Sequence, residues 1–229
     1  MFTARATEYI ESLPLRSHIV DDALVGRALE DAGVPVTQRL LDYHNALAGR
    51  VIVDGYDEHM LGLIHPEPRF QDRLAVEAFH VGPEPIMGFE EPGNWYVSRA
   101  DAHPDYEMLI DPDGKLYSNP DNLEPSSFEL HFEQYALISA FVDQQPTSFV
   151  PLNFFNGNDY LVETLLPRLA KYRSDALSDE CTDFYTSQDF IFLWQASWCR
   201  LWYPANSVPE PFGDTRLSDD TTDPHEQVS

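Results

Sequence analysis

Cysteine is scarce in this 229-residue chain, which contains only Cys181 and Cys199. Two cysteines are too few for the disulfide framework of a small secreted domain, and they form no C-x-x-C pair of the kind used in zinc and redox sites. The cysteine content therefore favours a reducing compartment. It also predicts that both thiols are free and buried.

Positive charge is scarce as well, because 14 Lys and Arg accompany 39 Asp and Glu and give a formal net charge of -25. Phosphate backbones and anionic membrane surfaces repel such a chain, whereas basic proteins and cations are attracted over long range. The charge argues against nucleic acid and membranes as partners. Between Arg99 and Arg168, twelve acidic residues accompany one base, Lys115. A solvated surface that keeps the protein soluble is the simpler interpretation of this block.

Long apolar segments are missing too. The first residues, MFTARATEYIESL, have no basic start followed by an apolar region, and the best apolar run, YALISAFV, is far too short to cross a bilayer. We therefore expect a soluble cytoplasmic protein. With 43% hydrophobic and 13% aromatic residues, the chain can bury the core of one domain or of a domain with an extension.

The motifs of common enzyme classes are absent, since the chain has no G-x-S-x-G elbow, no Walker loop and no G-x-G-x-x-G. Two groups of possible metal ligands match no known spacing and are better interpreted as surface or packing residues. These groups are His59 with His65, and Glu129 with His131 and Glu133. We expect no metal, no cofactor and no catalytic residue. A pair of carboxylates acting as acid and base stays open, because any two of so many acids can meet in space.

The segment YEMLIDPDGKLYSN, residues 106 to 119, raises the question of a calcium loop. An EF-hand loop counted from Asp111 requires glycine at its sixth position and glutamate at its twelfth, but Leu116 and Asn122 stand there. A hairpin fits better. Pro112 presets a turn φ, Asp113 and Gly114 tolerate positive φ, and the flanking residues have strand character.

The pattern predicts an α+β domain over residues 1–145. We expect helices over 22–32, capped by Asp21 or Asp22, and from the cap Thr37 to Gly49, where Leu40, Leu41, His44 and Leu47 share a face. Strands are expected at 50–56, 59–66, 73–81 and 94–99, followed by the hairpin. Residues 126–129 resemble a capping box that starts a helix with Phe128, Phe132, Tyr135, Ser139 and Val142 on one face.

A largely helical extension is predicted over residues 146–206. One helix would contain Leu161, Leu165, Leu169 and Tyr172 with a kink at Pro167. A second would run from about residue 186 to 203 and carry Trp194, Trp198 and Trp202 as a stripe. The stripe is either part of the core or an anchor for a partner. Residues 207–229, apart from NSVPEPFG, have the composition of a disordered acidic tail.

The order of these elements resembles the SUKH superfamily, whose members are mostly bacterial toxin-immunity proteins, with fungal cell-wall-synthesis regulators as relatives. The residues that carry the resemblance are Gly33-Val34-Pro35 before LLDYHNALAG, then Trp95-Tyr96, the hairpin, and the helix from Ser127 to Phe141. The resemblance implies a central, mostly antiparallel sheet with flanking helices, and a protein without catalytic residues that binds and blocks a cognate toxin in the cytoplasm.

Charge and resemblance together point to a basic toxin as partner, met by carboxylates that occupy the place of phosphates in its cleft. The candidate partner-binding residues are Asp101, Asp105, Glu107, Asp111 and Asp113, which lie on and beside the hairpin without a base among them. The alternatives are a carboxylate-based hydrolase and a non-catalytic regulatory scaffold.

Overall fold

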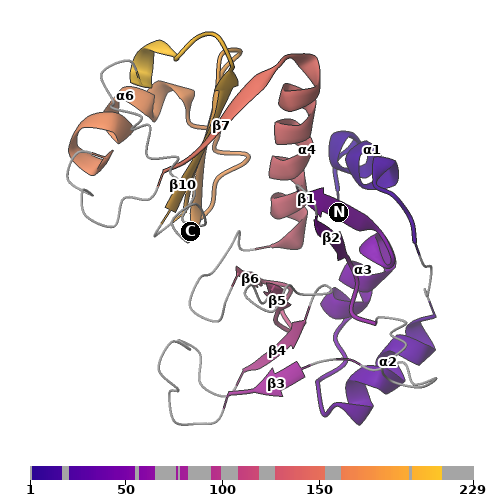
Figure 1. The fold of residues 1–229 in the computed structure, drawn as a ribbon. Coiled ribbons are helices and arrows are strands. Elements are labelled where there is room, and N and C mark those ends of the chain that lie inside the picture. Colours follow the sequence, from indigo (N-terminus) through magenta and orange to yellow (C-terminus); the bar gives the residue numbers. More distant parts are fainter. Residues whose placement is uncertain are drawn as a thin grey trace, which may run out of the picture. The chain divides into compact units, whose positions relative to one another are not determined.

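The computed structural model is an α+β protein with antiparallel sheets (Figure 1). It describes residues 2–16, 21–54, 57–64, 76, 78–81, 94–98, 108–118, 127–152, 161–195 and 198–212. The chain divides into two compact units. The first contains residues 1–137 and 179–181, and the second contains residues 138–178 and 182–229, so the division falls inside one helix.

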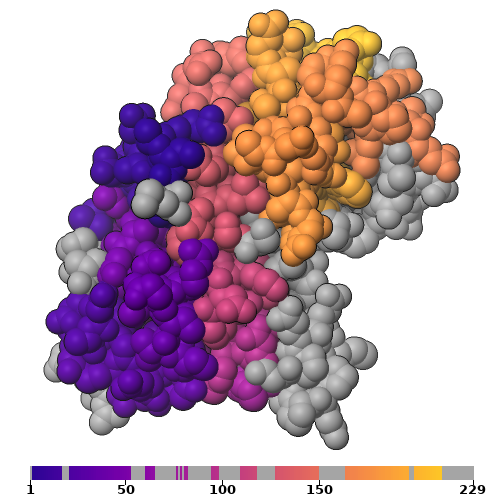
Figure 2. All heavy atoms as spheres, turned by 180° about the vertical axis from the view of Figure 1, so that it is seen from behind, coloured from indigo at the N-terminus to yellow at the C-terminus, as the bar shows by residue number. Residues whose placement is uncertain are grey.

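The first unit begins with three helices, α1 (Ala4–Ser12), α2 (Asp22–Asp31) and α3 (Gln38–Leu47). Two of the predicted caps are confirmed. The Asp21 carboxylate accepts hydrogen bonds from the first N–H groups of α2, and the Thr37 hydroxyl accepts one from Leu40 N at 3.3 Å. Gly33 and Gly49 follow α2 and α3 with φ of 79° and 72°, as expected of helix-terminating glycines. Figure 2 shows the atoms of this N-terminal part of the chain in indigo and purple.

Two antiparallel sheets follow in the first unit. The smaller pairs β1 (Val51–Asp54) with β2 (Asp57–Met60), and the larger has the order β3-β4-β5-β6. Its strands are β3 (Ala78–His80), β4 (Trp95–Ser98), β5 (Met108–Ile110) and β6 (Leu116–Ser118). The predicted hairpin is confirmed, because β5 and β6 pair with Ile110 opposite Leu116.

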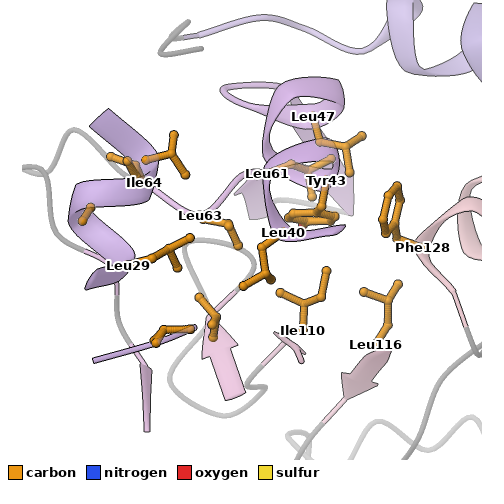
Figure 3. Close-up of a cluster of buried hydrophobic side chains, with 14 of the residues drawn as sticks. Leu29, Leu40, Tyr43, Leu47, Leu61, Leu63, Ile64, Ile110, Leu116 and Phe128 are labelled. Carbon is orange, nitrogen blue, oxygen red and sulfur yellow. The ribbon is translucent and has the colours of Figure 1, made fainter. Parts of the chain in front are cut away.

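The core of the first unit joins helices and sheet. Leu29 from α2, Tyr43 from α3, Ile110 from β5 and Phe128 from the following helix are buried in one cluster, and Figure 3 shows how their side chains converge. His44 is fully buried beside them, and its Nδ1 accepts a hydrogen bond from Leu63 N at 3.0 Å. This histidine therefore belongs to the core, as its place on the apolar face of α3 predicted.

The long helix α4 (Phe128–Gln144) starts where the sequence predicted. The Ser127 hydroxyl accepts a hydrogen bond from Leu130 N at 3.3 Å and caps it, whereas Ser126 lies outside the described residues. Phe128 and Phe132 are buried, but the predicted face does not continue, since Val142 is exposed. Ala136, Ile138 and Phe141 are the buried apolar residues of the later turns.

The second unit is built around a four-stranded antiparallel sheet of order β7-β10-β9-β8. The strands are β7 (Thr147–Leu152), β8 (Thr182–Thr186), β9 (Ile191–Gln195) and β10 (Trp198–Pro204). The expected helix over residues 186–203 was therefore wrong, and so was the expectation of a largely helical extension. A four-residue spacing is also a multiple of the strand period of two, so three tryptophans four residues apart do not distinguish a helix from strands.

The predicted tryptophan stripe does not form. Trp194 lies opposite Cys199 and packs with Phe192 and Leu201, whereas Trp202 is on the other face of the sheet against Phe149. Both described indoles are partly buried. The side chain of Trp198 lies outside the described residues.

The other predicted helix of this unit is present but irregular. A π-helical turn (Leu161–Leu165) is followed by α6 (Leu166–Leu169) and a 3-10 turn (Ala170–Tyr172). Pro167 stands at the start of α6, directly after the π-helical turn, so the helix changes its form next to the predicted kink. Leu165 and Leu169 pack into the core of this unit.

The predicted acidic tail begins later than residue 207. A 3-10 turn (Glu210–Phe212) buries the ring of Phe212, whose centroid lies 5.2 Å from that of Phe190 and 5.7 Å from that of Phe192. Residues 207–212 are thus part of the second unit, because one large aromatic side chain completes its core. Residues 213–229 lie outside the described part, so the prediction of disorder there is untested.

Candidate functional site

The five acids predicted to bind a partner differ in where the structure places them. Asp101, Asp105 and Glu107 lie outside the described residues. Asp111 and Asp113 both belong to the turn between β5 and β6, but Asp111 is 1% exposed whereas Asp113 is on the surface. The two carboxylates of this turn therefore differ in what they can contact: that of Asp111 lies inside the protein, and that of Asp113 faces solvent.

The Asp111 carboxylate is fully engaged inside the turn. Its Oδ1 accepts hydrogen bonds from the backbone N–H groups of Asp113 and Lys115, both at 2.9 Å. Its Oδ2 accepts from the Tyr117 hydroxyl at 3.1 Å and from Asn94 Nδ2 at 3.4 Å. With these donors and almost no exposed area, Asp111 holds the turn and has no surface to offer a partner.

Burial raises the pKa of Asp111, and the hydrogen bonds from Lys115 N–H, Tyr117 and Asn94 oppose that shift without cancelling it. A raised pKa and a buried carboxyl are properties of many catalytic acids. Here the same atoms close a turn, and a general acid needs access to a substrate. The position of Asp111 therefore favours a structural role over a catalytic one.

The backbone of the turn is closed in the same region. Gly114 N donates to Asp111 O at 2.9 Å, and Asp111 N donates to Lys115 O at 3.1 Å. Gly114 has φ of 85°, which L side chains rarely adopt. The conformation therefore requires glycine, and a Cβ at Gly114 would also approach Arg39 Nε to 3.0 Å, so that the Arg39 side chain would have to shift.

Helix α3 supports the turn from outside the hairpin. The Thr37 hydroxyl, which caps α3, also donates to Pro112 O at 2.6 Å, and Arg39 Nε donates to Asp113 O at 3.4 Å. Asp113 thus has its N–H bound to Asp111 and its C=O bound to Arg39. The exposed carboxylate of Asp113 stands on a backbone fixed from both sides.

Arg39 connects the turn to α4. Its two terminal nitrogens donate to the two oxygens of Glu129 at 2.7 Å each, and its guanidinium carbon lies 4.6 Å from the centre of the Phe128 ring. Burial is the largest single effect and would raise the pKa of Glu129, but the hydrogen bonds from Arg39, a backbone hydrogen bond and the charge of Arg39 act together in the opposite direction and lower this pKa to about 2. The guanidinium is therefore paired with an ionised carboxylate over the whole physiological range.

The acids and histidine weighed as metal ligands on α4 have other partners. Glu129 binds Arg39, and Glu133 accepts hydrogen bonds from Thr3 N and the Thr3 hydroxyl, both at 2.7 Å. His131 is buried, with its ring 4.6 Å from that of Tyr135. His65 and the side chain of His59 lie outside the described residues. Within the described part of the chain, no three His, Cys, Asp or Glu side chains form a group that could hold a metal ion.

The thiols complete the survey of reactive groups. Cys199 is buried, Cys181 is partly buried, and both are free, so the prediction of free thiols is confirmed and that of burial holds for Cys199. Burial raises the pKa of Cys199 to about 12, and burial together with Asp179 and Glu180 raises that of Cys181 to about 11. A nucleophilic cysteine requires a lowered pKa instead.

No helix in the described ranges is long and apolar enough to span a membrane.

Sequence reasoning identified the turn but missed the residues that support it. Thr37 was recognised as a helix cap, but nothing local connects it or Arg39 to a hairpin about 75 residues later in the chain. The Asn94 contact was missed for the same reason. The braced turn, which we define as residues 111–114 with Thr37, Arg39 and Glu129, is the candidate site.

No protein-family model, no curated protein and no solved structure matches this chain.

Proposed function

We propose that this protein is a cytoplasmic immunity protein of the SUKH type, which binds a basic toxin and blocks its active site. The observation that carries the proposal is a strongly acidic chain, with net charge -25, that presents the Asp113 carboxylate on a turn held by Thr37 and Arg39 of the α3 region. An inhibitor surface gains affinity when it is rigid before binding, because less conformational entropy is lost in the complex.

The negative charge of the chain indicates which kind of toxin it would bind. A toxin that acts on nucleic acids or nucleotides needs a basic cleft, and carboxylates can occupy the positions that phosphates take there. Asp113 lies at the tip of the hairpin, and Asp101, Asp105 and Glu107 precede β5 in the chain. These acids would steer the encounter, and those desolvated in the complex would slow dissociation.

Packing of the motifs supports the SUKH resemblance. Gly33, at the end of α2, lies so close to Trp95 of β4 that an added Cβ would be 3.2 Å from the indole. The hairpin residues Ile110 and Leu116 and the α4 residue Phe128 belong to the same core cluster as Val34. The segments that carry the resemblance therefore pack against one another.

Co-expression tests the proposal. The chain would be produced together with the protein encoded next to it in its native organism, and the pair purified through a tag on one partner. We expect a stoichiometric complex with a basic protein whose toxicity the chain suppresses. If the neighbouring product does not bind, or if the chain alone hydrolyses a substrate, the immunity proposal is contradicted.

A further inference from the structure

Within the described residues, the sheet of the second unit ends at β7, and we call the outer side of this strand the open edge. β7 is its outer strand, and β10 is the neighbour beside it (Figure 1). β10 is also the one described element with which β7 makes extensive contact. An outer strand presents backbone N–H and C=O groups on its free side and can pair there with another extended segment.

The register shows which backbone groups face this free side. Ala205 N donates to Pro146 O at 3.0 Å, so by the alternation of antiparallel pairs Ser148 and Val150 direct their groups toward β10. Phe149, which lies opposite Trp202, then directs its N–H and C=O outward. Pro151 falls in the same outward set, where a residue without N–H removes no hydrogen bond from the sheet.

An aromatic pair stands at the same place. Phe149 is 50% exposed, and its ring centroid lies 5.3 Å from that of Trp202 on the adjacent strand. Farther into the sheet, the residues on this face, Ile191, Leu193 and Phe184, are buried. Among the described side chains of this face, the exposed apolar surface thus lies at the rim, next to the outward backbone groups of Phe149.

We propose that the open edge of β7 binds an extended segment of a basic protein, which adds a strand to the sheet and places an apolar side chain on Phe149 and Trp202. The basic character of the segment rests on the proposed function and on charge complementarity with a chain of net charge -25. Asp143, exposed near the end of α4, precedes β7 by four residues and adds local negative charge.

The aromatic pair decides which side chain of the segment faces it. Because Phe149 and Trp202 are aromatic and lie on one face of the sheet, an apolar residue faces the pair and the basic residues alternate with it. A second copy of this chain is a poor occupant, because each copy carries the same large negative charge.

Synthetic peptides test the site without knowledge of the partner. The probes are an acetylated and amidated octapeptide of alternating lysine and valine, and a matched octapeptide of alternating lysine and serine with the same charge. Their affinities for the full chain are measured by calorimetry. We expect the valine peptide to bind about tenfold more tightly, because only it supplies apolar side chains to the pair.

Phe149→Ser tests the location, and Leu15→Ser is the matched control because Leu15 is 51% exposed in the first unit. We expect Phe149→Ser to weaken binding of the valine peptide about tenfold and Leu15→Ser to leave it within about twofold. Phe149→Pro, which an outer strand tolerates at an outward N–H, removes a backbone donor as well and should weaken binding at least as much. Equal affinity of Phe149→Ser and the unmodified chain overturns the proposal.

Hydrogen exchange of the Phe149 amide adds a readout specific to strand addition, since this N–H should become protected when the peptide binds. Unchanged exchange in the complex contradicts the added strand. A concentration-dependent dimer that Phe149→Ser abolishes would assign the edge to a second copy and also overturn the proposal. Peptide binding that requires Phe149 supports this edge site even if no toxin partner is found, so the two proposals fail separately.

Discussion

The Asp111 carboxylate accepts hydrogen bonds from four donors, two of which are backbone N–H groups of its own turn. A side chain that replaces backbone acceptors in this way stabilises a local conformation that the strands alone do not define. Asp113, two residues away, has the same side chain on the surface. The difference between the two acids is one of position in the turn: the carboxylate of Asp111 is buried and that of Asp113 is exposed.

Asp111→Ala should lower the free energy of unfolding by about 1–3 kcal/mol, because it leaves buried donors without an acceptor. Asp113→Ala is the matched control in the same turn and should change stability by no more than about 0.5 kcal/mol, since only an exposed carboxylate is removed. Urea denaturation measures both. Equal effects of the two substitutions would contradict the conclusion that the hydrogen bonds of Asp111 stabilise the turn.

Stability should also depend on Glu129 in acid. Its pKa is lowered to about 2 in the folded protein from an ordinary value of 4.5, so the ion pair with Arg39 contributes fully above pH 4.5 and is lost as the pH falls toward 2. The difference in melting temperature between the unmodified chain and Glu129→Gln should therefore shrink over this interval. A difference that stays constant from pH 6 to pH 2.5 would show that the pair contributes nothing through its charge.

At this scale the sequence predicted the turn but not its surroundings. Pro112 and Gly114 are local signals with a direct conformational meaning, and Gly114 has the expected positive φ. The burial of Asp111 depends on Asn94 and Tyr117, and the fixed position of Asp113 depends on Arg39. Contacts between residues so far apart in sequence leave no local pattern.

At the scale of elements, the helices with strong caps were predictable and the strands of the second unit were not. Asp21 and Thr37 define helix starts by a chemistry that needs only three or four consecutive residues. The segment from Phe190 to Gln195 is almost continuously apolar, and such a run is shared by buried helices and buried strands. Pairing with β8 and β10 decides between the two, and pairing is a tertiary property.

Gly114→Ala tests the turn as an element. It should destabilise the protein by more than about 1 kcal/mol, because alanine resists φ of 85° and its Cβ would press on Arg39. Gly26→Ala is the control, since Gly26 lies within α2 and the nearest atom to an added Cβ there would be Val36 Cγ1, at 3.8 Å. That substitution should stabilise the helix by about 0.5–1 kcal/mol. Thermal unfolding of both variants should therefore shift in opposite directions, and shifts of the same sign would contradict the account.

Phe212→Ala tests whether the segment after β10 belongs to the second unit. Loss of a buried aromatic ring between Phe190 and Phe192 should cost about 3–5 kcal/mol. Val208→Ala, at a residue 49% exposed in the same segment, should stay within about 0.5 kcal/mol. Chemical denaturation followed by tryptophan fluorescence separates them. A neutral Phe212→Ala would contradict the conclusion that this segment completes the core of the second unit.

At the scale of the whole molecule, charge is the property that most limits the choice of partner. A net charge of -25 acts over about 10 Å at 0.1 M salt, and it favours encounter with basic surfaces before any contact forms. This property is read directly from composition, whereas the α+β class required the pattern of elements. The identity of the partner lies in surface geometry that neither composition nor periodicity encodes.

The rate of association with the co-purified partner tests the central claim most directly. Stopped-flow mixing at low and high salt would compare the unmodified chain with the triple variant Asp101→Lys, Asp105→Lys and Glu107→Lys. We predict slower association and a flatter salt dependence for the variant, because rim carboxylates act mainly on the encounter. Association rates that are unchanged by the triple reversal would contradict the account and leave these acids as a solubilising surface.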